Sequence, residues 1–181
     1  LAIGIACCLI IFLWVQNELG YDRFHKNAGD LYRIVQESPQ GGKVFHINVT
    51  PSALGPLLKE RYPEIVDSAR YTLTRLDMGR EEIHFRESVA LVDGSFLQMF
   101  SFTLLEGTPQ AALENPYSIV ISEEMKKKYF AGEDALGKAL RVSDSFDLNV
   151  TGVMEDIPND SHLQFDCLIP FKLLGESGYN M

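Results

Sequence analysis

The sequence lacks the elements of a disulfide or zinc scaffold. It has three cysteines among 181 residues; Cys7 and Cys8 are adjacent in an apolar segment, and Cys167 lies in a predicted strand. If the apolar segment lies in lipid, no cysteine pair remains within a folded domain. Neither a CxxC pair nor a zinc-type cysteine–histidine spacing is present. We therefore expect three small, buried apolar side chains.

Basic residues are also scarce. The chain has 16 Lys and Arg against 25 Asp and Glu, which gives a net charge of −9 and a pI near 4.9. Nucleic-acid-binding proteins need a basic face, so this class of partner is excluded. The contents of 46% hydrophobic and 23% charged residues are those of an ordinary folded domain. The length allows one domain, or two small lobes, beside a membrane helix.

No charged or strongly polar residue occurs in LAIGIACCLIIFLWV, residues 1–15. A helix of this length extends about 22 Å, less than the roughly 30 Å of a bilayer core. Because the chain starts at Leu1 rather than Met, we expect a transmembrane helix cut at its front. Trp14 would lie at the membrane–water interface. A secretory signal peptide is disfavoured because the following QNELG has no small-residue cleavage site, and a buried core helix is the remaining alternative.

No Lys/Arg cluster follows the apolar segment. Glu18, Asp22, Arg23 and Lys26 nearly cancel in charge. Because cytoplasmic flanks of membrane helices carry an excess of basic residues, this flank is more typical of the outer side.

Catalytic motifs are missing too. No serine lies in a G-x-S-x-G motif. GEDALGKA, residues 132–139, matches a phosphate-binding loop except at its last position, where Ala139 lacks the hydroxyl that holds Mg²⁺. The segment also follows a predicted helix and precedes a predicted strand, the reverse of the required order. We interpret it as a helix-to-strand turn.

Acidic residues and a histidine gather in one segment, which contains Asp156, Asp160, His162 and Asp166. Such a group could hold a metal or perform acid–base chemistry. However, Asp, Asn, Pro and Ser are the usual turn residues, and no second group completes a site. The other histidines are scattered, and we expect them to be surface or half-buried: His25, His46 and His84. We predict no catalytic residue, no metal site, no cofactor and no enzymatic activity.

The chain contains a mixed pattern of strands and helices. Residues 31–37 and 43–49 alternate around Gly41-Gly42 and predict a hairpin. Further strands are expected at residues 64–75, 83–93, 118–122, 138–143, 147–154 and 163–171, with a turn at 143–145. Helices are expected at residues 50–62 and 123–131, with a short helix or turn at 94–100 and a further element starting at 171. The pattern predicts an α+β fold with mixed, mostly antiparallel sheets and about three helices.

The helix after residue 122 has the strongest local signals. Ser122 is a good N-cap residue, and Glu123 and Glu124 lie where the helix dipole favours negative charge. The basic run of residues 126–128 lies toward the other end. Gly132 is expected to end the helix.

Several segments together resemble MacB/FtsX-type ABC transporter permeases. They are LIIFLWVQNELGYDRFHKNAGDLYRIV, TPSALGPLLKERYPEI, VDGSFLQMFSFTLLEG, SIVISEEMKKKYFAGEDALGKALRV and LNVTGVMEDIPNDSHLQFD. The LGK turn, the strand ending in TGV and the D-x-P-x-x-S-H loop recur in that family in this order. The resemblance covers nearly the whole chain, and the ordered set is more specific than any single motif.

The resemblance implies that residues 1–17 end the first transmembrane helix and that residues 18–181 form a two-lobed periplasmic core domain, incomplete at its C-terminal end. It implies an inner-membrane location, with the domain in the periplasm. Expected partners are the lipid bilayer, an ABC ATPase subunit (in the family the ATPase is separate or fused), a second permease subunit in a homodimer or heterodimer, and a periplasmic adaptor. The expected function is to couple ATP hydrolysis to export or mechanical work outside the membrane.

Two other functions fit the same pattern. A membrane-anchored sensor or ligand-binding domain would also have a span followed by an α+β module. An anchored hydrolase would use Asp156, Asp160 and His162. The substrate and the direction of transport are not encoded in any motif.

Overall fold

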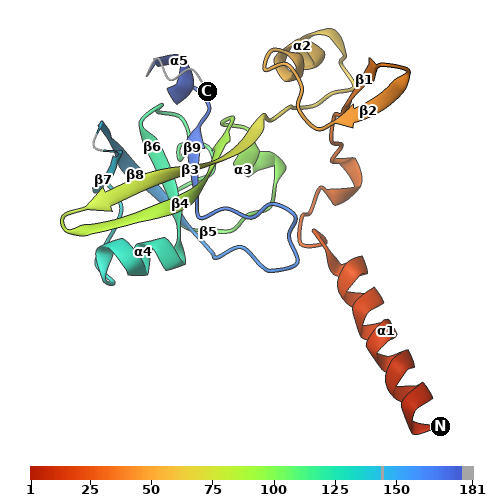
Figure 1. The fold of residues 1–181 in the computed structure, drawn as a ribbon. Helices are drawn as coiled ribbons and strands as arrows, with labels where there is room; N and C mark the ends of the chain where they lie inside the picture. Colours follow the sequence, from red (N-terminus) through yellow and green to blue (C-terminus); the bar gives the residue numbers. More distant parts are fainter. Residues whose placement is uncertain (144, 177–181) are drawn as a thin grey trace.

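The computed structural model describes residues 1–143 and 145–176. Its first helix, α1 (Ala2–Gly20), has no buried residue and projects away from the rest of the chain (Figure 1). With 19 residues and a mean hydropathy of 1.8, it is long and apolar enough to cross a membrane. Cys7 and Cys8 lie exposed on it, so the expectation that they are buried in protein is wrong; Cys167 is buried as expected. The exposed apolar surface of α1 is of the kind that a lipid bilayer would cover.

A small lobe follows α1. A 3-10 turn (Ala28–Asp30) leads to the hairpin of β1 (Gln36–Gln40) and β2 (Lys43–Ile47), and α2 (Leu54–Arg61) lies near it (Figure 1). Gly41 and Gly42 both have positive φ, as a tight two-residue hairpin turn requires. The predicted hairpin is therefore confirmed. Its first strand starts at Gln36 rather than at residue 31. The turn pairs Gln40 with Lys43, and in that register Gln36 lies opposite Ile47, where β2 ends.

The larger lobe is a seven-stranded sheet that closes on itself. Its strands are β3 (Tyr71–Arg80), β4 (Ile83–Val92), β5 (Leu104–Glu106), β6 (Ser118–Ser122), β7 (Ala139–Val142), β8 (Phe146–Met154) and β9 (Cys167–Pro170). The order is β5-β8-β6-β9-β4-β3-β7, and β7 pairs with both β3 and β8. Six strands thus form a closed ring, with β5 attached outside β8. Of the pairings, only β4–β9 and β6–β8 among the described strands are parallel.

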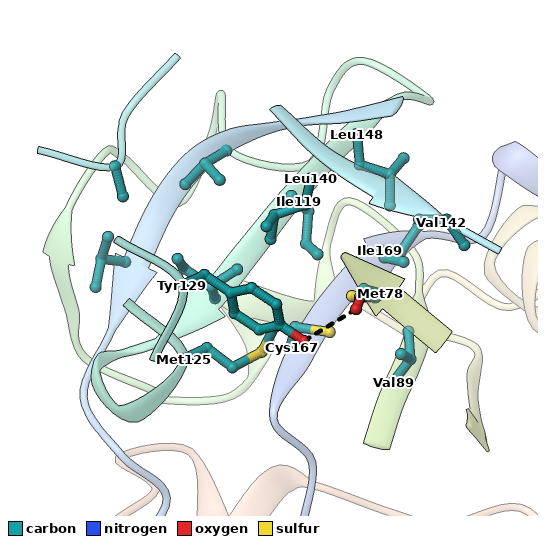
Figure 2. Close-up of a cluster of buried hydrophobic side chains, with 14 of the residues drawn as sticks. Met78, Val89, Ile119, Met125, Tyr129, Leu140, Val142, Leu148, Cys167 and Ile169 are labelled. Carbon is teal, nitrogen blue, oxygen red and sulfur yellow. Dashed lines mark hydrogen bonds between the residues drawn. The ribbon is translucent and has the colours of Figure 1, made fainter. Parts of the chain in front are cut away.

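Side-chain alternation divides the core into two apolar clusters. On β4, Val89 and Leu91 face one cluster, while Ala90 and Val92 face the other. The first cluster takes residues from all six strands of the ring, so it fills the interior (Figure 2). The second lies outside, where Phe96 of the one-turn helix α3 (Phe96–Met99) packs with neighbouring aromatic rings. Period-two burial on both faces is what a covered sheet requires.

Helix α4 (Glu123–Phe130) contributes Met125, Tyr129 and Phe130 to the interior cluster. The Tyr129 hydroxyl donates to Oε1 of Glu87 at 2.7 Å. It also contacts the Met78 carbonyl at 3.3 Å (Figure 2). Glu87 is 3% exposed and also accepts from Lys128 at 2.8 Å. Burial, with the Glu87 carboxylate beside it, raises the pKa of Tyr129. This paired buried carboxylate fixes α4 against β4.

The ends of α4 are partly as expected. The Ser122 hydroxyl accepts from the Met125 amide, which confirms the predicted N-cap. At the other end Ala131, rather than Gly132, takes the left-handed conformation that first ends the helix, and Gly132 follows with positive φ as well. Residues 132–139 then lead into β7 as the predicted helix-to-strand turn.

Other boundaries differ from the predictions. Residues 64–70 are not strand, because their backbone bonds elsewhere: the Arg70 amide donates to Asp93, and the Ser68 carbonyl accepts from the Ser95 hydroxyl. Residues 163–166 belong to the loop before β9. The predicted turn at 143–145 includes residue 144, which lies outside the described residues. The last predicted element, which starts at residue 171, includes residues 177–181, and these also lie outside the described residues. A one-turn helix, α5 (Leu173–Glu176), occupies the described part of that element.

The α+β, mostly antiparallel and two-lobed arrangement is confirmed (Figure 1). The described part of the domain has two eight-residue helices, α2 and α4, and two four-residue helices, α3 and α5.

Replacing Phe96 by Ala should destabilise the larger lobe by about 3–5 kcal/mol, because it opens a cavity among packed rings. Phe96 is 0% exposed. The matched control is Phe45→Ala on β2, where Phe45 is 50% exposed. The loss of unfolding free energy there should be about 0.5 kcal/mol or less. Urea unfolding followed by circular dichroism measures both, and equal losses would contradict the assignment of Phe96 to the core.

Candidate functional site

The segment directly after α1 docks onto two loops of the larger lobe. Residues 21–27 contribute to this contact from the side of α1, and residues 99–101 and 158–164 contribute from the larger lobe. We call this contact the stem joint. It lies where the chain leaves α1 and meets the folded domain, so it determines how firmly the two are connected.

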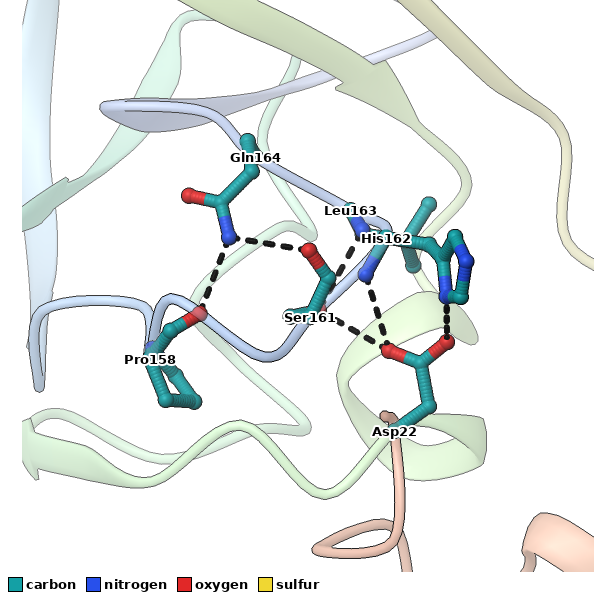
Figure 3. Close-up of polar contacts among 6 residues, drawn as sticks. All are labelled: Asp22, Pro158, Ser161, His162, Leu163 and Gln164. Carbon is teal, nitrogen blue, oxygen red and sulfur yellow. Dashed lines mark hydrogen bonds and ion pairs between the residues drawn. The ribbon is translucent and has the colours of Figure 1, made fainter. Parts of the chain in front are cut away.

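Asp22 makes the first half of the stem joint. Its Oδ1 accepts from the Ser161 hydroxyl at 3.1 Å and from the His162 amide at 3.0 Å, and its Oδ2 accepts from Nδ1 of His162 at 2.7 Å (Figure 3). The Asp22 amide donates to the Asp160 carbonyl at 2.9 Å. Asp22 has a φ of 56°, a left-handed conformation that Asp tolerates better than most residues. Both its backbone and its side chain therefore bind one loop.

The charge of Asp22 is stabilised by these contacts. Partial burial favours the neutral acid, but the hydrogen bonds from His162 and Ser161 outweigh burial and lower the pKa of Asp22. A carboxylate can only accept, so Nδ1 of His162 carries the proton that it donates. The His162 side chain is 71% exposed and that of Asp22 is 33% exposed, so solvent weakens this pair.

The loop that receives Asp22 is ordered by its own hydrogen bonds. The buried Ser161 hydroxyl donates to Asp22 and accepts from the Leu163 amide at 3.2 Å. The Gln164 side-chain amide donates to the carbonyls of Pro158 and Ser161, each at 2.9 Å (Figure 3). The loop therefore offers a preformed set of donors to the carboxylate.

His25 makes the second half of the stem joint. Its ring is 5% exposed and packs among Phe24, Phe100 and Phe102. Its Nδ1 accepts from the Ser101 amide at 3.2 Å. Burial lowers the pKa of His25, although the Asp22 charge opposes this effect. The expectation that this histidine is surface or half-buried is wrong, because aromatic residues distant in sequence enclose it.

Two further bonds extend this second contact. The Lys26 amide donates to the Ser101 hydroxyl at 2.9 Å, and the Asn27 side chain donates to the Met99 carbonyl at 3.1 Å. Because the two halves of the stem joint bind different loops, the stem is held at two places and cannot rotate freely about one of them.

The loop of residues 155–166 also connects to the sheet and to α4. Asp156 accepts from the Glu124 amide at 2.8 Å, which gives α4 a second capping side chain. Asp166 accepts from the Ser88 amide at 2.7 Å and returns a backbone bond to the Ser88 carbonyl at 2.8 Å. One loop therefore contacts the stem, α4 and β4.

The acidic segment singled out in the sequence does not converge on one centre. Asp156 caps α4, Asp166 binds β4, His162 binds Asp22, and Asp160 uses its carbonyl. Among residues 1–143 and 145–176, no group of three or more His, Cys, Asp or Glu is placed to hold a metal ion.

The two remaining histidines lie on the surface. His46 lies near Glu37 on the hairpin, and His84 contacts the Glu81 carbonyl at 3.1 Å. Sequence reasoning missed the roles of Asp22 and His25. Their one signal was the mixture of aromatic and charged residues in YDRFH.

Comparison with known proteins decides the family. The sequence profile of the MacB-like periplasmic core domain matches residues 1–181. This chain belongs to the MacB-like periplasmic core domain family. The resemblance to MacB/FtsX-type permeases drawn from the sequence motifs is thereby confirmed. No match was found among curated proteins.

Solved structures share the fold of this MacB-like domain. A domain assigned to a permease protein of Porphyromonas gingivalis is 31% identical, with a TM-score of 0.59, over 66% of this chain and 56% of that one. The periplasmic region of MacB from Actinobacillus actinomycetemcomitans is 20% identical (TM-score 0.51; 66% and 53%). The extracellular domain of the noncanonic ABC-type transporter YknZ from Gram-positive bacteria is 18% identical (TM-score 0.50; 62% and 58%). The chain thus spans somewhat over half the length of these relatives.

Replacing Asp22 by Asn should loosen the stem joint by about 1–2 kcal/mol, because a charged acceptor of several hydrogen bonds is lost. Because the pKa of Asp22 is lowered, its contribution is present above about pH 3.9 and is lost as the pH falls further. Hydrogen exchange of the His162 amide measures the effect. Asp30→Asn, at an exposed position, is the control; equal protection in both variants would contradict the role of Asp22.

Replacing Asp156 by Ala should weaken the first turn of α4 by about 0.5–2 kcal/mol, the usual effect of losing a cap. Faster exchange of the Glu124 amide would report it. Asp160→Ala is the matched control, since Asp160 binds Asp22 through its backbone carbonyl. An unchanged Glu124 amide in Asp156→Ala would show that Ser122 alone caps the helix.

Proposed function

We propose that this chain is the periplasmic core domain of an ABC transporter permease subunit, preceded by the end of its first membrane helix. In this proposal, ATP hydrolysis on a partner ATPase moves the helix, and the domain converts that motion into export or mechanical work outside the membrane. Family membership and the stem joint support the proposal. Substrate need not pass through the domain for work to cross the bilayer.

The stem joint is the observation that carries the proposal. A helix can move a domain only if the connection between them resists bending. Here seven hydrogen bonds, four at Asp22 and one each at His25, Lys26 and Asn27, span the connection. They reach two separate loops, so tilting of α1 would be passed to the larger lobe rather than absorbed.

The partners follow from this proposal. Residues 1–17 lie in the bilayer of the inner membrane, with the polar last turn of α1 at its surface, and residues 18–181 lie in the periplasm. We infer a separate ABC ATPase, a second permease subunit in a homodimer or heterodimer, and a periplasmic adaptor. We assign no catalytic, metal-binding or cofactor-binding role to Asp156, Asp160 or His162, because their contacts are structural.

Affinity purification of the full-length protein in mild detergent tests the assembly. A stoichiometric ABC ATPase, whose hydrolysis rate changes when the permease is bound, is the expected result. A protein that emerges alone or with a kinase would overturn the permease function and favour a membrane-anchored sensor.

The double variant Asp22→Ala/His25→Ala should keep the ATPase bound but lose the ATP-driven movement of the domain, because the stem joint no longer transmits it. Spin labels at the exposed Glu114 of two subunits measure the change in separation on ATP binding. The control is Asp30→Ala/His46→Ala, which alters the same residue types at exposed positions and should move as the wild type does. A movement that persists in the double variant would contradict transmission through the stem joint.

A further inference from the structure

The two halves of the stem joint hold their protons differently. Nδ1 of His25 accepts from the Ser101 amide, so the ring must be neutral with its proton on Nε2. Nε2 is buried and has no hydrogen-bond partner among the described residues. Asp22, by contrast, faces donors only and is bound as a carboxylate.

Protonation of His25 is incompatible with the docked geometry. A second proton would sit on Nδ1 and point at the Ser101 N–H, so that two donors would face each other. The resulting cation would lie in a ring that is 5% exposed, and burying a charge without a partner is costly. Moving the ring out toward water relieves both conflicts and breaks the bond to the Ser101 amide, which leaves the bonds of Lys26 and Asn27 to hold this side of the joint.

We propose that the stem joint is an acid-sensitive latch, in which mild acidification releases His25 from Ser101 while Asp22 still holds the loop at residues 158–164. The second attachment of the stem is then weakened, because only the bonds of Lys26 and Asn27 remain on that side. The inference rests on the proposed function only for its consequence, which is that the stem joint transmits the movement of α1 to the larger lobe less firmly in acid. The release itself is a property of the joint.

The charged surroundings of His25 decide whether it can act this way. On its own segment the charged residues are Asp22, Arg23 and Lys26, and Asp22 is the one whose charge favours protonation of the ring. The segment 99–102 brings no ionisable side chain. The loop at 158–164 brings Asp160 and His162, and His162 is paired with Asp22.

The pH window follows from the different pH ranges in which His25 and Asp22 titrate. Burial lowers the pKa of His25, so the undocked state binds more protons and docking weakens as the pH falls below about 6.5. The pKa of Asp22 is also lowered, so its contacts persist until the pH falls below about 3.9. Between these ranges one contact opens while the other remains.

Hydrogen exchange of the full-length protein in lipid nanodiscs tests the latch, at about pH 7.5 and about pH 5.5. After correction for the intrinsic exchange rate, the Ser101 amide should lose protection several-fold in acid, while the His162 amide keeps its protection. An unchanged Ser101 amide would overturn the proposal, and so would a parallel loss at both amides. Neither reading depends on whether an ATPase co-purifies.

Variants separate the role of His25 from a general effect of acid. His25→Gln retains a side-chain acceptor that does not titrate, so the response of Ser101 to pH should disappear. His25→Leu removes the acceptor, so Ser101 should be unprotected at both pH values. His84→Gln, at a surface histidine, should respond as the wild type does; loss of the response in this control would overturn the proposal.

Discussion

The carboxylate of Asp22 accepts hydrogen bonds from residues up to 140 positions further along the chain. Together with the bond from the Asp22 amide to the Asp160 carbonyl, these bonds link the end of α1 to a distant part of the domain. Without them, the residues after α1 would be held mainly through His25, Lys26 and Asn27, since α1 has no buried residue. The contact between Asp22 and the loop at residues 158–164 depends on three features. They are the charge of Asp22, its left-handed backbone and the internal hydrogen bonds of the loop.

The contact is useful because its receiving side is rigid. The loop at residues 155–166 is bonded to α4 through Asp156 and to β4 through Asp166. Helix α4 packs into the interior of a ring that β7 closes by pairing with both β3 and β8. A closed ring has no edge at which two strands can slide apart, and its interior is densely packed. Displacing the loop therefore displaces the ring as one body.

Local signals predicted part of this structure. Ser122 and the acidic residues after it sufficed for α4, and Gly41-Gly42 sufficed for the hairpin, because caps and tight turns are determined by neighbouring residues. Ring closure and the stem joint depend on partners far apart in sequence. His162 was noticed as part of an acidic segment, but nothing nearby indicated that its partner is Asp22. Likewise, the burial of His25 depends on Phe100 and Phe102, which periodicity around residue 25 does not reveal.

The long separation between Asp22 and its partners also constrains the order in which the protein is made. The joint cannot form until residue 162 has been synthesised. Helix α1 is therefore made well before its attachment to the domain exists, and closing so large a loop is entropically costly until the ring has folded. A subunit whose ring misfolds would consequently be left with a free stem, so that only correctly assembled copies are mechanically connected.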